Sequence, residues 1–376
     1  MFKQYKLKNF HFQLILYICA LTIIGIFVIG SARPDLQPKQ IFGFAVGLCL
    51  MAFVALLDYS FLMKFHWIYY AAMMVLLILT ELFGVNVNGA QRWLEIIPDQ
   101  IQIQPSEFAK LAIVAFFAYF FSKYVDNLNT PRILFTSFAF VGVPLLFILK
   151  QPDLSTTICT AVIFVGLLFI AGLSYKIIVG VLAVAIPVFI VFFTYIVQLA
   201  KSTTADVPYQ LDRVMAWLYP NDQRWASKAL QQQNSIMAIG SGQLLGKGLN
   251  NSEATSMLNA NYILEPQTDF IFAVIGEELG FLGCFIILVL LFLTVVECIV
   301  IGSKAKDLQG KLICCGMATW IGFQSFVNIA VNTGVFPNTG VPLPFVSYGL
   351  SSVLAIYIGM GFVINVGLQP KKYQGG

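Results

Sequence analysis

Long runs of apolar residues, separated by short polar segments, dominate the pattern of hydrophobic positions along the chain. Ten runs are long enough, or nearly so, to span a membrane, because a helix needs roughly 20 apolar residues to cross the hydrocarbon core. They are 12–31, 41–57, 66–84, 107–122, 134–149, 155–173, 176–199, 270–301, 312–335 and 345–367. The pattern predicts an all-α polytopic membrane protein forming a single domain, 1–376. The fourth and fifth runs are short, so we expect tilt or local membrane thinning to accommodate them.

The positions of basic residues predict the side of the membrane on which each loop lies, because cytoplasmic loops carry an excess of Lys and Arg. With ten spans, both termini lie on one side. A cytoplasmic N-terminus puts twelve basic residues in inner segments and four in short outer loops. The inner residues are Lys3, Lys6, Lys8, Lys64, Lys123, Arg132, Lys176, Lys304, Lys306, Lys311, Lys371 and Lys372, and the outer ones are Arg33, Lys39, Arg92 and Lys150. We therefore expect both termini in the cytoplasm.

One long polar segment, residues 200–268, lies between the seventh and eighth spans and is expected on the extracytoplasmic side. It keeps apolar residues at helical spacing, and Leu211, Val214 and Leu218 fall on one face. This predicts short helices lying on the outer membrane surface. The glycine-rich stretch 240–248 lacks the spacing of a phosphate-binding loop, so a tight turn is the better interpretation.

The composition agrees with a membrane protein. Of the 376 residues, 59% are hydrophobic and 11% are charged, against about a quarter charged in a typical soluble domain. A soluble protein of this size could not bury so much apolar surface, and the same figures exclude a disordered chain and a nucleic-acid-binding domain. The seven cysteines lie in apolar runs and the two histidines are far apart, so neither a disulfide framework nor a metal site is predicted.

Charged residues within the apolar runs are candidate functional groups, because a charge inside the bilayer is costly. Glu107 and Lys110 lie three residues apart on one helical face, where they either neutralise each other as a structural ion pair or contact a substrate. Asp153, at the start of the sixth span, is a candidate helix cap. Glu297 lies near the inner end of its span, and its side chain is expected to reach towards the cytoplasmic lysines.

Asp269 precedes the run 270–301, which as a helix would be longer than the hydrocarbon core is thick. The uncharged part, 279–301, is long enough to span alone, which places Asp269 about 15 Å further out, near the outer headgroup layer. A helix N-terminus there favours a carboxylate and anionic ligands nearby. Of the glutamates that follow, only Glu277 is placed to share its side of the helix. The spacing is equally consistent with a simple helix cap.

Two further segments are expected at the same outer depth. Arg92 and Trp93 offer a cation beside an aromatic ring, and the cation is suited either to gripping a phosphate or to anchoring the loop to lipid headgroups. The segment 334–349 carries no charge, and its three prolines and its glycines predict a rigid, non-helical, re-entrant segment. A carboxylate, cations and a stiff loop suit chemistry on a lipid-linked anion, and they equally suit a transporter gate.

Six motifs occur in order along the chain: NGAQRW, QPSEFAK, QPDLSTT, IGSG with GKG, EPQTDFIFAVIGEELG and GVPLPFVSYGLSS. Together they resemble the shape, elongation, division and sporulation (SEDS) family of bacterial membrane proteins, over nearly the whole chain. GVPLP and AQRW are most similar to the elongation branch. Many members carry a basic residue where this chain has Gln102. Division-type members often have a glutamate in place of Asn261 and a lysine in place of Thr339, which also favours the elongation branch.

The resemblance implies a peptidoglycan glycosyltransferase of the bacterial cytoplasmic membrane that polymerises lipid II at the outer face during cell elongation. The family's essential aspartate corresponds to Asp269, and Arg92, Glu107 and Lys110 match the family's RW and QPSExxK motifs. The implied reaction inverts the anomeric carbon and expels undecaprenyl pyrophosphate, with Asp269 as general base. Arg92 and Lys110 are expected to help hold the diphosphate, Glu107 and Glu277 are further candidate substrate contacts, and the long outer loop is expected to cover the acceptor strand.

The resemblance leaves open whether basic side chains or a divalent cation, Mg²⁺ or Mn²⁺, stabilise the leaving group. The expected partners are lipid II, a class B penicillin-binding protein and other membrane proteins of the elongation complex. Alternatives are a division- or sporulation-type polymerase, a lipid II flippase, and a scaffold that only recruits a transpeptidase. A flippase would also have broken helices and intramembrane charges, but the ten spans contain no convincing internal repeat.

Overall fold

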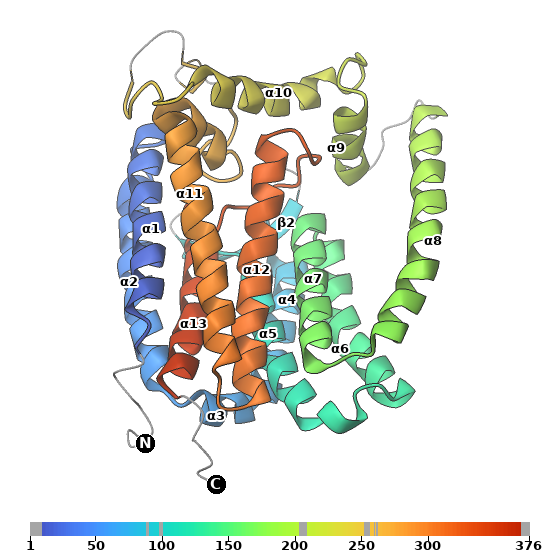
Figure 1. The fold of residues 1–376 in the computed structure, drawn as a ribbon. Coiled ribbons are helices and arrows are strands. Elements are labelled where there is room, and N and C mark those ends of the chain that lie inside the picture. The colour runs from blue at the N-terminus through green and yellow to red at the C-terminus, as the bar shows by residue number, and fades with distance from the viewer. Residues whose placement is uncertain are drawn as a thin grey trace.

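The structure, a computed structural model, describes residues 10–87, 90–97, 101–202, 209–251, 256–258, 260 and 262–369. Within these ranges ten helical segments are long and apolar enough to cross a membrane, which confirms the predicted architecture (Figure 1). They are α1 (Phe12–Ala32), α2 (Gln37–Leu56), α3 (Tyr59–Leu62) continued through a 3-10 turn (Met63–Phe65) into α4 (His66–Phe83), α5 (Pro105–Lys123), α6 (Pro131–Lys150), α7 (Leu154–Ala171), α8 (Tyr175–Ser202), α11 (Ile271–Ser303), α12 (Leu308–Asn332) and α13 (Leu350–Leu368).

The fourth and fifth spans are longer than their apolar runs, so the expectation that they are short is wrong. α5 has 19 residues and α6 has 20. Each begins with a proline, which suits the first turn because no intrahelical hydrogen bond is lost there. α5 extends beyond the predicted run 107–122 by Pro105 and Ser106 at its start and Lys123 at its end. The tenth span begins at Leu350 rather than at 345, because the preceding residues are not helical.

α1 begins and α13 ends at the same end of the bundle, the lower end in Figure 1. His11, directly before α1, contacts Glu297 of α11 with 2.6 Å between Nδ1 and Oε1. Glu297 therefore pairs with a histidine, not with the cytoplasmic lysines expected from the sequence. The common end of α1 and α13 is what an even number of spans requires. That this end is cytoplasmic stays a prediction.

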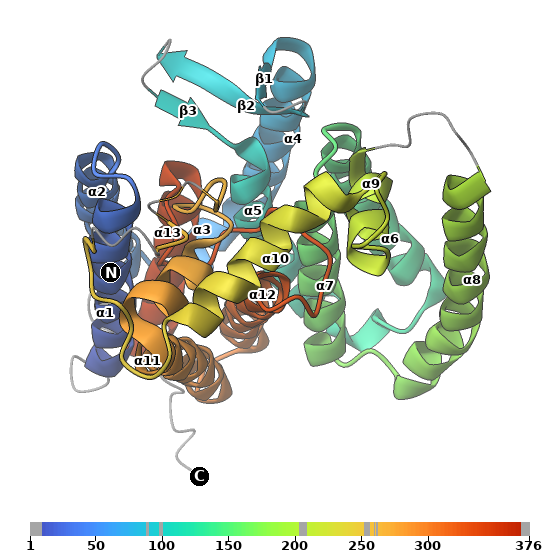
Figure 2. The same ribbon diagram turned by 90° about the horizontal axis from the view of Figure 1, so that it is seen from above.

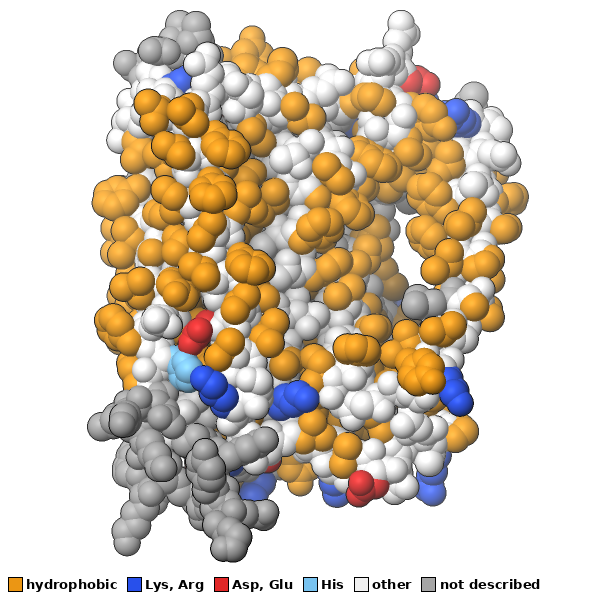
Figure 3. All heavy atoms as spheres, in the orientation of Figure 1, with side chains coloured by type: hydrophobic (Ala, Val, Ile, Leu, Met, Phe, Trp, Pro, Cys, Tyr) orange, Lys and Arg blue, Asp and Glu red, His pale blue; other side chains and the backbone are white. Residues whose placement is uncertain are grey.

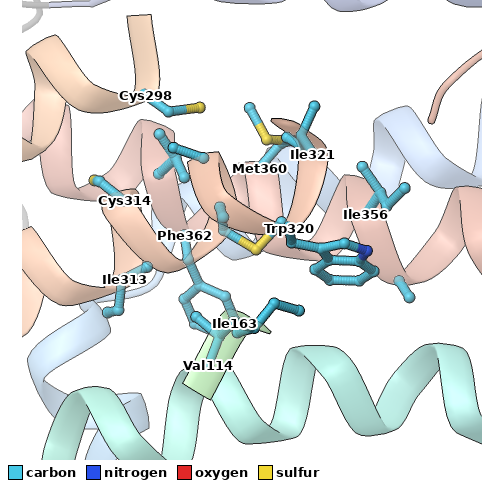
Figure 4. Close-up of a cluster of buried hydrophobic side chains, with 14 of the residues drawn as sticks. Val114, Ile163, Cys298, Ile313, Cys314, Trp320, Ile321, Ile356, Met360 and Phe362 are labelled. Atoms are coloured by element: carbon cyan, nitrogen blue, oxygen red, sulfur yellow. The ribbon is translucent and has the colours of Figure 1, made fainter. Parts of the chain in front are cut away.

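The core lies where α5, α12 and α13 meet. α13 packs against α2, and α12 packs against α11, α7 and α5. Figure 4 shows the centre of this cluster, in which Trp320 and Ile321 of α12 lie beside Ile356 and Met360 of α13. All four side chains are fully buried. The most buried helices are therefore those that carry the polar residues described below.

α8 differs from the other spans because it stands apart from the bundle (Figures 1 and 2). Among its described side chains only that of Ala200 is buried. In Figure 3 apolar side chains cover the flank of the protein, and the charged side chains visible on this face lie towards its two ends. An apolar flank of this kind is expected for a surface in contact with lipid tails.

Two short helices and a small sheet occupy the upper end of the bundle. α9 (Tyr209–Leu218) and α10 (Ala226–Ser241) confirm the helices predicted within 200–268, and α10 crosses over the end of α12 (Figure 2). The antiparallel sheet consists of β1 (Val85–Val87), β2 (Ala90–Ile97) and β3 (Ile101–Ile103), with β2 in the middle. The prediction lacks this sheet, although QIQIQ alternates with the period of a strand.

The segment 334–349 is non-helical and enters the bundle, as predicted. Leu343, Phe345 and Val346 are at most 2% exposed. The backbone N–H of Leu343 donates to the Ser347 hydroxyl at 2.7 Å, and that hydroxyl donates to the Thr268 carbonyl at 2.6 Å. The segment is thereby fixed to the residues directly before α11.

The glycine-rich stretch 240–248 ends α10 and forms a turn that packs on a kink in α11 at Gly280. Four backbone hydrogen bonds join the two: Lys247 N to Glu277 O, Gly248 N to Glu278 O, Phe281 N to Gln243 O and Leu282 N to Leu244 O. Gly246 has φ +79°, and a Cβ there would lie 2.1 Å from the Glu278 carbonyl oxygen. Close backbone approach therefore explains the glycine at 246, and the predicted turn is confirmed.

We predict that Gly246→Ala destabilises the protein, because the positive φ costs an L-residue about 1 kcal/mol and its Cβ would meet Glu278. Gly248→Ala is the matched control, with φ +89° and no atom within 4 Å of its Cβ. Thermal unfolding in detergent should rank Gly246→Ala below Gly248→Ala, and both below Gly240→Ala, which has open space within α10. Equal midpoints for the first two variants would contradict the packing described here.

Candidate functional site

Asp269 lies in a non-helical segment at the upper end of the bundle, two residues before α11. The N-cap of α11 is Phe270, and no side chain makes a capping hydrogen bond there. The interpretation of Asp269 as a simple helix cap is therefore wrong. The Asp269 carboxylate is half-buried and lines a cavity of about 230 Å³.

Three carboxamide side chains of α12 fix the backbone around this aspartate. Gln324, Asn328 and Asn332 are spaced four residues apart, so they lie on one helical face, and each is at most 1% exposed. The amides of Asn328 and Asn332 both donate to the Asp269 carbonyl, each at 2.9 Å. Asn328 also donates to the Val341 carbonyl at 2.7 Å. We call these three side chains the carboxamide ladder.

The ladder also ties the segment 334–349 and α10 to the same place. Gln324 donates to the Pro342 carbonyl at 2.9 Å. Asn332 accepts from the backbone N–H of Ala273 at 3.1 Å, and its carbonyl accepts from the Ser235 hydroxyl of α10 at 2.9 Å. A buried carbonyl without a donor is costly. The ladder therefore fixes the backbone at Asp269 and in the segment 334–349, where these carbonyls find their donors.

Glu107 and Lys110 support the ladder from below instead of lining the cavity. The Lys110 ammonium donates to Glu107 Oε1 and to Gln324 Oε1, both at 2.7 Å. Gln324 Oε1 also accepts from the indole of Trp320 at 2.7 Å. Glu107 and Lys110 are at most 2% exposed. Of the two interpretations given above, this geometry is that of a structural ion pair.

Arg92, on β2, lines the cavity and is oriented by the start of α7. Its guanidinium donates to the backbone carbonyls of Gln151, at 3.1 Å, and Pro152. Its Nη1 is 4.0 Å from Asp153 Oδ1. Asp153 caps α7 by accepting from the backbone N–H of Thr156 at 3.1 Å, which confirms that prediction. The motifs NGAQRW and QPDLSTT, which lie about 60 residues apart in the sequence, are therefore in contact with each other through Arg92.

Arg213, on α9, is a site residue that the sequence analysis missed. It lines the cavity, and its Nη1 donates to the Asn338 carbonyl at 3.4 Å. A Cβ at Gly340, where φ is +74°, would lie 3.2 Å from Asp269 Oδ2 and 3.3 Å from Arg213 Nη1. Gly340 thus leaves the space in which the carboxylate and the guanidinium approach each other. No sequence feature indicated this role of Arg213, because an arginine on the polar face of an amphipathic helix is indistinguishable in the sequence from one that is exposed to solvent.

The cavity continues into a larger one of about 770 Å³, and Trp93, Glu265 and Tyr348 line both. The larger cavity extends to α2, where Lys39 and Phe42 line it. The Phe42 ring is 61% exposed on the flank of the bundle. The cavity beside Asp269 therefore borders a second one whose lining reaches the apolar flank at Phe42.

Burial raises the pKa of the Asp269 carboxyl to about 6. The positive charge of Arg213 opposes this rise, the negative charge of Glu265 adds to it, and Arg92 opposes it more weakly. A carboxyl group with this pKa is largely ionised at neutral pH. Its pKa is also near enough to neutral pH for the carboxylate to accept a proton, which suits a general base. The two arginines suit an anion bound in the same cavity.

Glu277 lies away from this cavity. It is 1% exposed, pairs with Lys247 at 2.8 Å, and accepts from the backbone N–H groups of Met257 and Leu258. The expectation that Glu277 shares a side with Asp269 is wrong, because Asp269 is not in the helix and the angular spacing of a helix does not apply to it. Glu277 holds the outer loop to α11. Asn261, where division-type members often have a glutamate, lies outside the described residues.

Comparison with known proteins gives consistent matches along the chain. The family model described as "Cell cycle protein", covering FtsW, RodA and SpoVE, matches residues 6–372. The probable peptidoglycan glycosyltransferase FtsW of Pasteurella multocida is 35% identical over 79% of this chain and 72% of its own. The peptidoglycan glycosyltransferase MrdB of Escherichia coli K12 is 33% identical over 94% of this chain and 92% of its own.

Solved structures agree with these relatives. Rod shape determining protein RodA of Thermus thermophilus is 26% identical, with a TM-score of 0.67 over 96% of this chain and 98% of its own. A chain from a peptidoglycan synthase complex that coordinates polymerization and crosslinking is also 26% identical, with a TM-score of 0.76 over 95% of this chain and 97% of its own.

We predict that Asn328→Leu, a change of similar volume, destabilises the protein by about 1–3 kcal/mol, because the Val341 carbonyl loses its donor while staying buried. The measurement is unfolding in detergent followed by circular dichroism. Phe326→Leu is the control on the same helix, because Phe326 is 55% exposed, and it should change little. Similar stability of the two variants would show that the ladder is dispensable.

Proposed function

Because the chain belongs to the FtsW, RodA and SpoVE family of multi-pass membrane proteins, the SEDS family, we propose that it polymerises lipid II with Asp269 as general base. It is a peptidoglycan glycosyltransferase, as its relatives are. The proposal places the reaction at the upper end of the bundle, on the outer face of the cytoplasmic membrane. The observation that carries it is the Asp269 carboxylate beside Arg213 in a cavity that also contains Arg92.

In the proposed reaction the 4-hydroxyl of one sugar attacks the anomeric carbon of another. Asp269 accepts the hydroxyl proton as the new C–O bond forms. The bond from the anomeric carbon to the phosphate oxygen breaks, and the undecaprenyl diphosphate leaves with its electron pair, so the anomeric carbon is inverted. One carboxylate within hydrogen-bond reach of the hydroxyl is sufficient for this step.

The leaving group gains negative charge in the transition state and needs fixed positive charge beside it. We assign this role to Arg92 and Arg213, because both line the cavity with Asp269 and a guanidinium can hold a phosphate with two hydrogen bonds. Lys110, which the family resemblance assigned to the diphosphate, instead acts through Gln324 on the segment that carries Pro342. Glu107 neutralises that buried lysine.

The lipid-linked nature of the substrate is supported by the path from the cavity to α2. A headgroup at Asp269 would lie next to a cavity of about 770 Å³ that shares Trp93 and Tyr348 with its site and is lined at α2 by Lys39 and Phe42. Phe42 lies on the apolar flank, where an undecaprenyl chain would stay in the membrane. Lys39 would add positive charge along the route of the diphosphate.

The cavity also fits a divalent cation of the kind that accompanies phosphates. Mg²⁺ in such sites is usually bound through one or two carboxylates together with substrate phosphate oxygens. Besides Asp269, the cavity is lined by Glu265, and we propose Glu265 as the residue that would hold the ion. The ion would supply positive charge to the diphosphate.

We propose that the protein acts in cell elongation with a class B penicillin-binding protein as partner. The elongation branch is favoured by GVPLP and by Thr339. The partner is supported by the similarity to a chain of a synthase complex that couples polymerization to crosslinking. Other membrane proteins of the elongation machinery are expected to join this pair.

Replacing Asp269 with asparagine should abolish polymerisation of lipid II by purified protein and partner, because the amide cannot accept the proton. Asp35→Asn is the control, since Asp35 is an exposed carboxylate paired with Arg33 in the turn between α1 and α2. Both variants should elute and unfold like wild type. Glycan made by Asp269→Asn would refute the base assignment. Wild type that makes no glycan but moves lipid II across liposomes would favour the flippase alternative.

The acidic limb of the pH profile should report Asp269. Below about pH 6 the carboxyl is protonated and cannot act as a base, so kcat/KM should fall as the pH drops through that value. Arg213→Gln should move the midpoint upwards, because the positive charge that lowers the pKa is removed. Arg33→Gln, at an exposed position, is the control and should leave the midpoint in place. An unshifted midpoint in Arg213→Gln would contradict the assignment.

A further inference from the structure

The first turn of α13 forms part of the wall of the cavity beside Asp269 and has no role in the steps above. Gly349, Ser351 and Ser352 line the cavity at this turn. We propose that the backbone N–H groups of this turn and the Ser352 hydroxyl bind the oxygens of the diphosphate as neutral hydrogen-bond donors. The inference rests on the proposed function, because it names further contacts of the same substrate.

The backbone of this turn offers N–H groups that have no acceptor within the helix. The first hydrogen bond of α13 runs from the Val353 N–H to the Gly349 carbonyl at 3.0 Å, so the N–H groups of residues 350–352 precede the helical pattern. The N-cap is Gly349, which has no side chain to cap them, and the first turn contains no acidic residue. An anion in the cavity would satisfy these donors, and the dipole of a 19-residue helix favours it.

The Ser352 side chain is an independent sign of a ligand at this turn. It is only 8% exposed and lines the cavity. Its hydroxyl has no hydrogen-bond partner in the part of the chain that the structure describes. Unlike the unpartnered hydroxyl of Ser325, it is not sealed inside the protein. Buried polar groups are nearly always hydrogen-bonded, so an unpartnered hydroxyl in a cavity wall indicates a partner that binds there.

Two hydrogen bonds fix the turn against its neighbours. The Tyr348 N–H donates to the Gln267 carbonyl at 2.8 Å, which joins the turn to the chain just before Asp269. The Gln104 N–H donates to the Ser351 hydroxyl at 2.8 Å, which joins the turn to the start of α5. Because these contacts hold the donors in place before a ligand binds, little reorganisation is needed when negative charge develops on the leaving group.

The contacts of Arg92 explain why the diphosphate would need neutral donors as well as charge. Arg92 Nε and Nη2 donate to backbone carbonyls, and Nη1 is 4.0 Å from Asp153 Oδ1. Arg92 therefore supplies positive charge, but most of its directed donors are used within the protein. The turn of α13 adds donors on another wall of the same cavity. A sugar hydroxyl would also suit Ser352, but it would leave the positive end of the helix dipole without an anion.

The test measures binding of undecaprenyl diphosphate to purified protein in detergent, with undecaprenol as the uncharged probe. Ser352→Ala should weaken diphosphate binding about tenfold, because a hydrogen bond to a charged group is lost, and should leave undecaprenol binding unchanged. Alanine is favourable in a helix, so this variant should unfold like wild type. Ser352→Thr keeps the hydroxyl and should bind the diphosphate like wild type. Ser325→Ala is the matched control, because Ser325 is a similarly buried, unpartnered serine outside the cavity lining, and it should also bind like wild type.

The same proteins separate this inference from the proposed function. In polymerisation assays product inhibition by undecaprenyl diphosphate should weaken about tenfold in Ser352→Ala, which a loss of stability alone would not cause. Asp269→Asn should still bind undecaprenyl diphosphate while making no glycan. Unchanged diphosphate binding in Ser352→Ala, equal weakening in Ser325→Ala, or no diphosphate binding by active wild type would overturn the inference and leave the base assignment intact. Glycan synthesis by Asp269→Asn would instead overturn the proposed function.

Discussion

Two amide N–H groups from α12 hold the backbone carbonyl of Asp269, and the arrangement of the upper end of the protein depends on this contact. Inside a helical bundle no water competes for backbone groups, so an irregular segment persists only where protein donors satisfy it. The carboxamide ladder supplies those donors to the chain before α11 and to the segment at Val341 and Pro342. Below it, Lys110 and Trp320 both donate to the side-chain oxygen of Gln324. This fixes the orientation of the Gln324 amide, with its N–H group directed at the Pro342 carbonyl.

This contact explains how the carboxylate proposed as the base is held in a fixed place although it lies in a non-helical segment. The hydrogen bonds from α12 are accepted by the backbone carbonyl of Asp269, so its carboxylate remains available to line the cavity. Arg213 approaches from α9 and Arg92 from β2, and each is oriented by backbone carbonyls of neighbouring segments. The proposed base and the two arginines therefore come from separate elements whose positions are set by hydrogen bonds.

The sequence predicted the parts of the fold that depend on hydropathy and the parts of the site that depend on a motif. Ten spans, the outer helices and the stiff segment 334–349 could be predicted, and Asp269 and Arg92 could be chosen, because each stands out locally. Arg213 could not, because its role comes from a tertiary approach to Gly340. Glu277 was misplaced since the helix was assumed to include residues before 271. The polar spacing of Asn328 and Asn332 within an apolar span was visible, but their acceptors were not.

Outside α12 the acceptors of the ladder amides are backbone carbonyls, namely those of Asp269, Val341 and Pro342, and this affects how the protein can change over evolutionary time. A backbone carbonyl is present whatever side chain the residue carries. A substitution at Pro342 therefore alters the wall of the cavity without removing the hydrogen bond that Gln324 donates. The donors are side chains and have no such freedom. The cavity wall at Pro342 can thus change its shape while α12 keeps the same hold on the backbone around Asp269.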